Sequence, residues 1–178
     1  VVLANEVLDA MPVEGFRISG DDVQSLYVRC KEDEQAKKTT ELSSEYKTAG
    51  EDVIKAVRSI EERIETSLPD AYCSEFNPAI SGWLESIASV LQQGIVLLID
   101  YGYAAAEYYH EERQMGTMMC HYQHRAHTDP LWYPGLQDIT AFVDFSDVAY
   151  SAVDAGFDVS GDTSQAMFLM SSGLDEFQ

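Results

Sequence analysis

Short unbroken runs of apolar residues occur at residues 1–4 (VVLA) and 95–99 (IVLLI) of this chain of 178 residues. Apolar runs that are continuous rather than alternating are typical of strands buried on both faces, as the strands of a parallel sheet are. We therefore predict two buried strands, of which the second is the clearer.

A helix is predicted just before the second strand, over residues 77–94. Asn77 is a good N-cap, Pro78 suits the first helical turn, and Gly94 is a suitable stop. The expected core face consists of Ile80, Leu84, Ile87 and Leu91. A helix that leads into an apolar strand indicates an α/β crossover, so we predict an α/β fold.

Residues 13–70 interrupt this pattern as an insertion. Within them, β-branched and aromatic residues flank a turn at Gly20, Asp21 and Asp22, which predicts a hairpin. Apolar residues then recur at helical spacing, which predicts one helix packed by a single apolar stripe. That stripe consists of Val53, Ile54, Val57, Ile60 and Ile64.

Residues 104–137 show little periodicity, and a segment of that length without regular elements is usually a functional loop or a lid. A capped helix is predicted next, with Ser146 as its N-cap and Gly156 as its stop. Its predicted inward side chains are Val148, Ala149, Ala152 and Val153. Two closing strands are then predicted around a turn at Gly161 and Asp162.

Acidic residues outnumber basic ones by 31 to 11, and the net charge is −20. Such a surface repels phosphate backbones and attracts cationic partners, so we expect no nucleic-acid partner. Cys30, Cys73 and Cys120 lie far apart and form neither a disulfide framework nor a CxxC pair, which fits a reducing compartment. No apolar run approaches the roughly 18 to 20 residues of a membrane span, so we expect no membrane partner.

Polar residues follow both predicted strands, at the edge where α/β sheets bind their ligands. Asn5 and Glu6 follow the first run, with Asp9 close behind, and Asp100 and Tyr101 follow the second. Carboxylates and an amide in this place can hold a cationic or polyhydroxylated ligand. A structural alternative, that Asn5 and Asp9 cap the following helical turn, stays open.

Other chemistry lacks its motifs. Asp100 could match the acid that ends a Walker-B strand, but no GxxxxGK[ST] or GxGxxG loop is present. Cys120, His121, His124 and His127 offer zinc ligands, yet their spacing matches no standard finger, and we predict no metal site. Hydrolase chemistry has little support, because there is no GxSxG elbow.

Six ordered blocks give the chain a family resemblance: ANEVLDAMPV, SEFNP, GIVLLIDYGY, RQMGTMMCHYQH, YPGLQDITAFVDF and TSQAMFLMSSG. In this order they resemble the MidA-type class I methyltransferases, relatives of the mitochondrial complex I assembly factor 7. The blocks run from one end of the chain to the other and correspond to roughly the C-terminal half of a family member.

The resemblance implies a Rossmann-like sheet of seven strands with a closing antiparallel hairpin. Residues 1–178 would be one partial methyltransferase domain, the C-terminal half of that sheet, with the hairpin and helical insertion at 13–70 and a substrate-side loop at 104–137. The Gly-rich cofactor loop would lie upstream of Val1, so we expect the chain alone to bind S-adenosylmethionine weakly or not at all. The missing N-terminal half, or a homodimer, would cover its bared surfaces.

The resemblance also implies S-adenosylmethionine-dependent methyl transfer to a protein arginine. Glu6, Asn5 and Asp9 would be catalytic, and Asn5 and Glu6 would also contact the cofactor. The implied substrate-side residues are Asp100, Tyr101, Tyr122, His124, Asp138 and Thr140. A bacterial cytoplasmic location is expected, with the mitochondrial matrix as the alternative. The competing function is a non-catalytic assembly protein whose acidic surface binds a basic partner.

Overall fold

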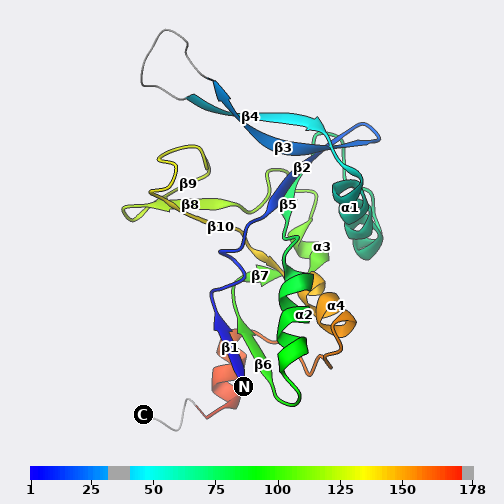
Figure 1. The fold of residues 1–178 in the computed structure, drawn as a ribbon, viewed down its shortest axis with the longest axis vertical. Coiled ribbons are helices and arrows are strands. Elements are labelled where there is room, and N and C mark those ends of the chain that lie inside the picture. The colour runs from blue at the N-terminus through cyan, green and yellow to red at the C-terminus, as the bar shows by residue number, and fades with distance from the viewer. Residues whose placement is uncertain (32–40, 174–178) are drawn as a thin grey trace.

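The computed structural model describes residues 1–31 and 41–173. Figure 1 shows an antiparallel sheet at the top of the view with a helix beside it. Below this sheet, two helices lie next to a short parallel strand pair, and a small sheet projects to the left. The described residues thus form a mixed α/β fold with more than one sheet.

The parallel sheet consists of β1 (Val2–Asn5) and β6 (Val96–Ile99). The predicted α/β crossover is confirmed, because parallel neighbours require such a connection. The expectation of two buried faces is wrong for β1, where Ala4 is buried but Leu3, on the opposite face, is 64% exposed. Successive side chains point to opposite faces, so the described chain packs one face of this strand only.

Helix α2 (Ile80–Val90) packs against helix α4 (Phe145–Asp154). Their buried apolar cluster contains Leu8, Ile80, Leu84, Val143 and Val148. Helix α2 is shorter than predicted at both ends. Asn77 accepts a hydrogen bond from the backbone N–H of Ala79 (2.9 Å) in the turn before the helix, and the helix ends before Gly94.

The N-cap of α4 is Asp144 rather than the predicted Ser146. The Asp144 carboxylate accepts hydrogen bonds from the backbone N–H groups of Ser146 (3.0 Å) and Asp147 (3.2 Å). The Ser146 hydroxyl instead accepts from the backbone N–H of Ala105 at 3.0 Å. Val153, predicted to face inward, is 57% exposed.

The upper sheet has the strand order β4-β3-β2-β5. Its strands are β2 (Glu14–Ser19), β3 (Asp22–Lys31), β4 (Glu41–Thr48) and β5 (Cys73–Phe76). The predicted hairpin is confirmed, with Ser19 paired to Asp22 around the turn. Strand β4 was not predicted, because its sequence is largely polar. It forms a strand through its pairing with β3.

Helix α1 (Glu51–Ile64) confirms the predicted helical stripe, and Val57 and Ile60 are fully buried. The helix packs against β3 and against the short helix α3 (Ala105–Tyr108). Their shared core contains Phe16, Ile18, Val23, Val57, Ile60, Tyr72, Tyr108 and Tyr109. The insertion therefore shares its core with Tyr72 and with residues of α3 and its C-terminal end.

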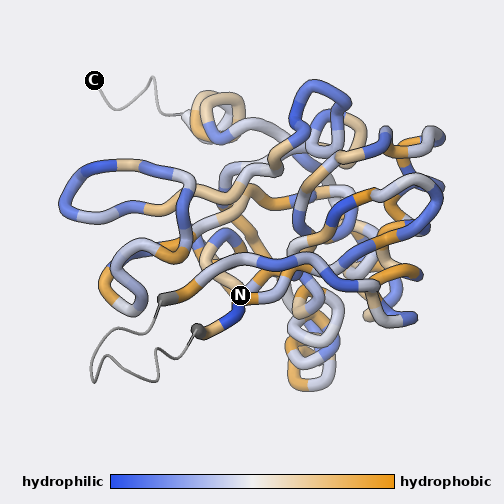
Figure 2. Tube along the Cα trace, turned by 90° about the horizontal axis from the view of Figure 1, so that it is seen from above, coloured by the Kyte–Doolittle hydropathy of each residue, from blue (hydrophilic) through white to orange (hydrophobic). Residues whose placement is uncertain are grey.

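Residues 104–137 are not a structureless loop. Besides α3, they contain β8 (Met119–Tyr122) and β9 (Arg125–His127), which form a three-stranded sheet with β10 (Asp138–Thr140). Strands of three or four residues are too short to show periodicity in a sequence. The sheet projects from the body in Figure 1, and Figure 2 shows its outer end as largely hydrophilic.

Two further short strands pair in parallel, β7 (Gly102–Tyr103) and β11 (Val143–Asp144). A Cβ atom on Gly102 would lie 1.9 Å from the carbonyl oxygen of Val143. Only glycine allows this approach of the two backbones. The glycine of the DYG sequence thus brings the chain after β6 against the chain before α4.

The closing strands predicted around Gly161 are absent from the described part of the chain. Residues 157–164 have no regular structure, and α5 (Gln165–Ser171) follows them. The hydroxyl of Ser164 caps this helix by accepting a hydrogen bond from the backbone N–H of Met167 (3.3 Å). Local preference explains the error, since the helix sequence QAMFLMS contains several strong helix formers behind a serine N-cap.

Candidate functional site

The candidate site lies where β1 and β6 end together. Asn5 is paired with Ile99, and the backbone N–H of Glu6 donates to the carbonyl oxygen of Ile99 at 2.8 Å. Glu6 has a φ of +50°, a left-handed backbone conformation that residues other than glycine rarely adopt. This residue turns the chain sharply at the end of the strand.

Asp100 holds that turn in place. Its Oδ2 accepts hydrogen bonds from the consecutive backbone N–H groups of Val7 (3.2 Å), Leu8 (3.0 Å) and Asp9 (3.4 Å). Its Oδ1 accepts from the backbone N–H of Tyr101 at 2.9 Å. Burial raises the pKa of Asp100, and the Asp9 carboxylate adds to this, while the bound N–H groups oppose it. Both oxygens therefore serve the local structure.

Asp9 is the buried acid of the site, with 5% of its surface exposed. Its Oδ2 accepts a hydrogen bond from the phenol of Tyr101. Its Oδ1 is fully buried and has no hydrogen-bond partner. Burial, followed by the bond to Asp9, raises the pKa of Tyr101 to about 12, so the phenol stays protonated and donates. An unpartnered buried carboxylate oxygen is suited to a ligand that brings a donor.

The segment that leads from β10 toward β11 closes this arrangement. Thr140 is buried, and its side chain opposes the rise in the pKa of Tyr101, which places it beside the phenol. The backbone N–H of Ala141 donates to the carbonyl oxygen of Asp9 at 3.0 Å. The structure therefore brings together four of the residues selected from the sequence: Asp9, Asp100, Tyr101 and Thr140.

Asn5 and Glu6 are both exposed at the end of β1. Neither side chain is needed to hold the turn, because Asp100 binds the N–H groups that follow. Their amide and carboxylate are free to contact a cofactor or an acceptor group at the same edge as Asp9.

Tyr122, His124 and Asp138 lie on the projecting sheet. Tyr122 stacks on Tyr133, with ring centroids 4.6 Å apart and an angle of 25° between the planes. His124 occupies the turn between β8 and β9 with a φ of +63°, and Asp138 is paired with His121 in an exposed position. Within the described ranges, no side-chain hydrogen bond joins any of these three residues to Asp9 or Tyr101.

A second buried carboxylate was not singled out from the sequence. Glu75 on β5 is 3% exposed, and its Oε1 accepts hydrogen bonds from the phenol of Tyr108 and from Thr117. Burial and the charge of Glu75 raise the pKa of Tyr108. Both Glu75 and Thr117 belong to the quoted blocks SEFNP and RQMGTMMCHYQH, but neither block predicts that they meet.

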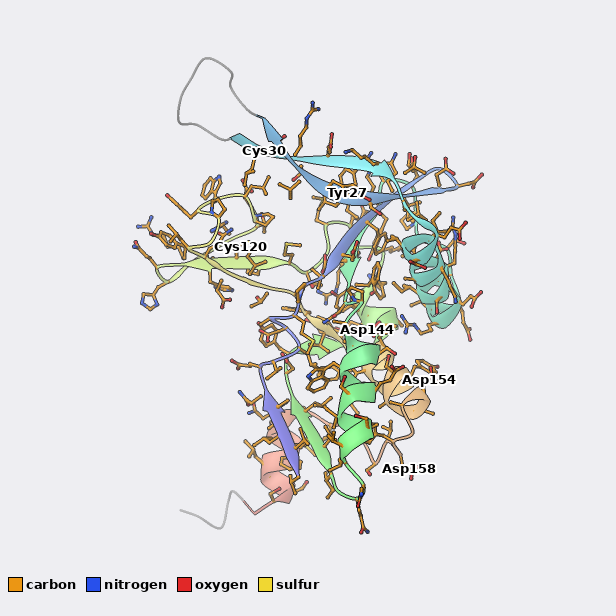
Figure 3. The ribbon with its side chains drawn as sticks, viewed as in Figure 1. Tyr27, Cys30, Cys120, Asp144, Asp154 and Asp158 are labelled. Carbon is orange, nitrogen blue, oxygen red and sulfur yellow. The ribbon has the colours of Figure 1, made fainter. Side chains whose placement is uncertain are left out.

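Asp144 forms a third polar centre at the start of α4, where Figure 3 labels it. Its Oδ2 lies 3.7 Å from one guanidinium nitrogen of Arg63. Another guanidinium nitrogen of Arg63 lies 2.5 Å from the carboxylate of Asp147. Burial raises the pKa of Asp144 to about 6, although Arg63 and the capped N–H groups lower it. These three side chains border a cavity of about 90 Å³ behind the site.

Cys30, Cys73 and Cys120 are free thiols, and Figure 3 shows Cys30 and Cys120 on different sheets. In the described part of the chain, no group of three His, Cys, Asp or Glu side chains is arranged to hold a metal ion. Nor is any helix of residues 1–31 and 41–173 long and apolar enough to cross a membrane.

The fold defines an α/β protein, and its candidate ligand site lies where its parallel strands end. A family model described as "Putative S-adenosyl-L-methionine-dependent methyltransferase" matches residues 1–163. The chain belongs to this methyltransferase family, and the resemblance seen in the sequence blocks is confirmed.

Three relatives resemble nearly the whole chain. A Caenorhabditis elegans protein named protein arginine methyltransferase NDUFAF7 homolog, mitochondrial, is 28% identical over 98% of this chain. A Burkholderia thailandensis crystal structure, described as a "likely methyl transferase" bound to S-adenosyl-homocysteine, is 37% identical with a TM-score of 0.84 over 98% of this chain. A native crystal structure from the same organism is 36% identical, with a TM-score of 0.85 over the same share. The chain spans 38%, 42% and 44% of these three relatives, respectively.

Proposed function

We propose that the protein to which this chain belongs transfers a methyl group from S-adenosylmethionine to an arginine side chain of a protein. The chain supplies the acceptor side of that site. Family membership supports the cofactor, and the name of the nematode relative supports the arginine. The observation that carries the proposal is Asp9, a buried acid with one oxygen held by Tyr101 and the other unpartnered.

A guanidinium group matches this carboxylate chemically. It is always charged and presents N–H donors in a planar fork, so it can satisfy the free Oδ1 of Asp9. A charge-assisted hydrogen bond in a buried place is stronger than one between neutral groups. Tyr101 holds the other oxygen, which fixes the orientation of the carboxylate and aims one nitrogen of the substrate.

S-adenosylmethionine supplies an electrophilic methyl group on its sulfonium. The substrate nitrogen forms a bond to that carbon as the sulfur–carbon bond breaks, and the nitrogen then loses a proton. Glu6 is exposed directly after β1, three residues before Asp9 in the chain, and accepts this proton, while Asn5 contacts the cofactor side of the site. Asp100 keeps the turn that positions them.

The seven-stranded sheet belongs to the same proposal. Strands β1 and β6 act as its fourth and fifth strands, and a further half of the protein covers the open face around Leu3. The coverage of the relatives supports this arrangement, since the chain matches less than half of each.

Asp9→Asn in the intact protein tests the proposal. Transfer of labelled methyl from S-adenosylmethionine to an arginine-containing peptide should fall by about 100-fold, because the buried charge that holds the guanidinium is lost. Binding of S-adenosylmethionine, measured by calorimetry, should change less than about twofold. Asp158→Asn changes an exposed acid beyond α4 and should leave both unchanged. Wild-type turnover in Asp9→Asn would refute the role of Asp9.

The second candidate function is non-catalytic binding of a basic partner, which the net charge of −20 favours. The same assay separates the two functions. If the intact wild-type protein binds arginine-rich peptides but transfers no methyl group to them, the binding function holds and the enzyme proposal fails.

A further inference from the structure

The buried carboxylate of Glu75 is surrounded by donors. Its Oε1 accepts hydrogen bonds from the Tyr108 phenol (2.9 Å), the backbone N–H of Thr117 (2.7 Å) and the Thr117 hydroxyl (2.7 Å). Gly116 has a φ of +74°, and a Cβ atom on it would lie 2.0 Å from Oε2 of Glu75. The glycine allows the backbone to wrap around the carboxylate, which favours a precise position for the next residue, Thr117.

Glu75 determines the direction of the hydrogen bonds made by Thr117. A threonine hydroxyl has one hydrogen, and here it points to Oε1 of Glu75. The hydroxyl oxygen therefore acts as an acceptor for the backbone N–H of Phe142, which lies 2.9 Å away. The Tyr108 hydroxyl lies 3.1 Å from the same oxygen. Replacing either member of this chain of bonds leaves a half-buried polar group without a partner.

The backbone of residues 141–143 forms hydrogen bonds with both Asp9 and Tyr101 of the candidate site. The consecutive N–H groups of residues 141, 142 and 143 donate to the carbonyl oxygen of Asp9, to the Thr117 hydroxyl and to the carbonyl oxygen of Tyr101. The ring of Phe142 meets the ring of Tyr101 edge to face, with centroids 5.4 Å apart and an angle of 83°. The Tyr101 phenol then donates to Asp9. Thr117 thus holds the segment against which Tyr101 packs.

We propose that Thr117 is a positioning residue for the Tyr101–Asp9 pair, acting through the backbone and ring of Phe142 with its hydroxyl oriented by Glu75. This inference rests on the proposed function, because it gives the pair its role in holding the acceptor. It adds residues of β5 and of the segment before β8 to a site that otherwise comprises the ends of β1 and β6. Neither Thr117 nor Glu75 touches the unpartnered oxygen of Asp9.

Two variants of the intact protein separate positioning from simple stability. Thr117→Val keeps the shape and removes the hydroxyl, whereas Thr117→Ser keeps the hydroxyl. With ¹³C-labelled tyrosine, the Tyr101 ring signal (assigned with Tyr101→Phe) should shift in Thr117→Val and stay at its wild-type position in Thr117→Ser. The Phe142 amide should exchange its hydrogen at least about tenfold faster in Thr117→Val only.

Val57→Ala is the stability control. It opens a cavity in the core under α1, where Val57 is fully buried, but removes no group that bonds Thr117 or Tyr101. It should therefore destabilise the protein while leaving the Tyr101 signal unmoved. Methyl-transfer kinetics give the functional measurement, in which Thr117→Val should lower kcat about tenfold at an unchanged KM for S-adenosylmethionine, with rescue in Thr117→Ser.

An unmoved Tyr101 signal in Thr117→Val, or the same shift in Val57→Ala, would overturn the positioning role. These spectroscopic measurements do not require turnover. If the wild type transfers no methyl group while the Tyr101 signal still responds to Thr117→Val alone, the proposed function fails and the positioning of the pair stands.

Discussion

Tyr101 donates its phenol hydrogen to the buried carboxylate of Asp9, although 92 residues separate them in the sequence. The two residues follow β6 and β1, whose paired ends bring them to one edge of the sheet. The other oxygen of Asp9 is buried and has no hydrogen-bond partner.

Tyr101→Phe should lower the free energy of unfolding at pH 7 by about 1–3 kcal/mol, because both oxygens of a buried carboxylate then lack donors. Urea denaturation measures this loss. Tyr133→Phe removes the phenol oxygen of a residue that is 52% exposed and should leave the stability unchanged. Equal stabilities for Tyr101→Phe and the wild type would mean that the phenol does not bind Asp9 in solution.

Asp100→Asn should destabilise the turn after β1 by about 1–3 kcal/mol, since an amide offers one acceptor oxygen where the carboxylate offers two. The backbone N–H groups of Val7, Leu8 and Asp9 should exchange their hydrogens faster, as NMR would show. Asp158→Asn, on the exposed surface, is the matched control. Slow exchange at residues 7–9 in Asp100→Asn would contradict the capping role.

Two glycine substitutions should have opposite effects on stability. Gly102→Ala places a Cβ atom against the backbone of Val143 and should cost about 3 kcal/mol or more. Gly82→Ala lies within α2, where a Cβ atom meets nothing within 4 Å, and should stabilise by about 0.5–1 kcal/mol. Thermal unfolding of both variants measures the difference. A tolerated alanine at Gly102 would exclude the close pairing of β7 and β11.

Asp144 should make the stability depend on pH. Its pKa is about 6 in the folded protein and about 4 in an unfolded chain, so its contribution is full below pH 4 and is lost as the pH rises to 6. The free energy of unfolding of the wild type, relative to Asp144→Asn, should therefore fall by about 3 kcal/mol over this range. Chemical denaturation at several pH values measures it, with Asp154→Asn at the exposed end of α4 as the control. Parallel pH profiles for wild type and Asp144→Asn would contradict the raised pKa.

Much of the site followed from the sequence because of one rule of sheet geometry. Parallel strands end at the same edge, so polar residues after residues 1–4 and 95–99 were expected to meet there. Asp9, Asp100 and Tyr101 do so. The choice left open at Asp9, cap or function, is sharpened, because Asp100 binds the N–H groups of the turn and Asp9 keeps an oxygen free.

The remainder depended on contacts between distant segments. Glu75 and Thr117 are 42 residues apart. Nothing in the sequence around either residue indicates that Gly116 lets the backbone before Thr117 approach the Glu75 carboxylate so closely. The short strands β7 to β11 carry no periodicity. Such short elements take their structure from pairing partners that local sequence does not identify.

The sequence by itself carried the family resemblance, through six ordered blocks of residues. It also determined the parallel strand pair and the group of polar residues at its edge, because these follow from apolar runs and the residues just after them. Only the tertiary structure decided which acid holds the turn, which acid keeps a free oxygen and which threonine supports the pair. Those assignments depend on burial and on the direction of individual hydrogen bonds, and both are settled by residues far away in the chain.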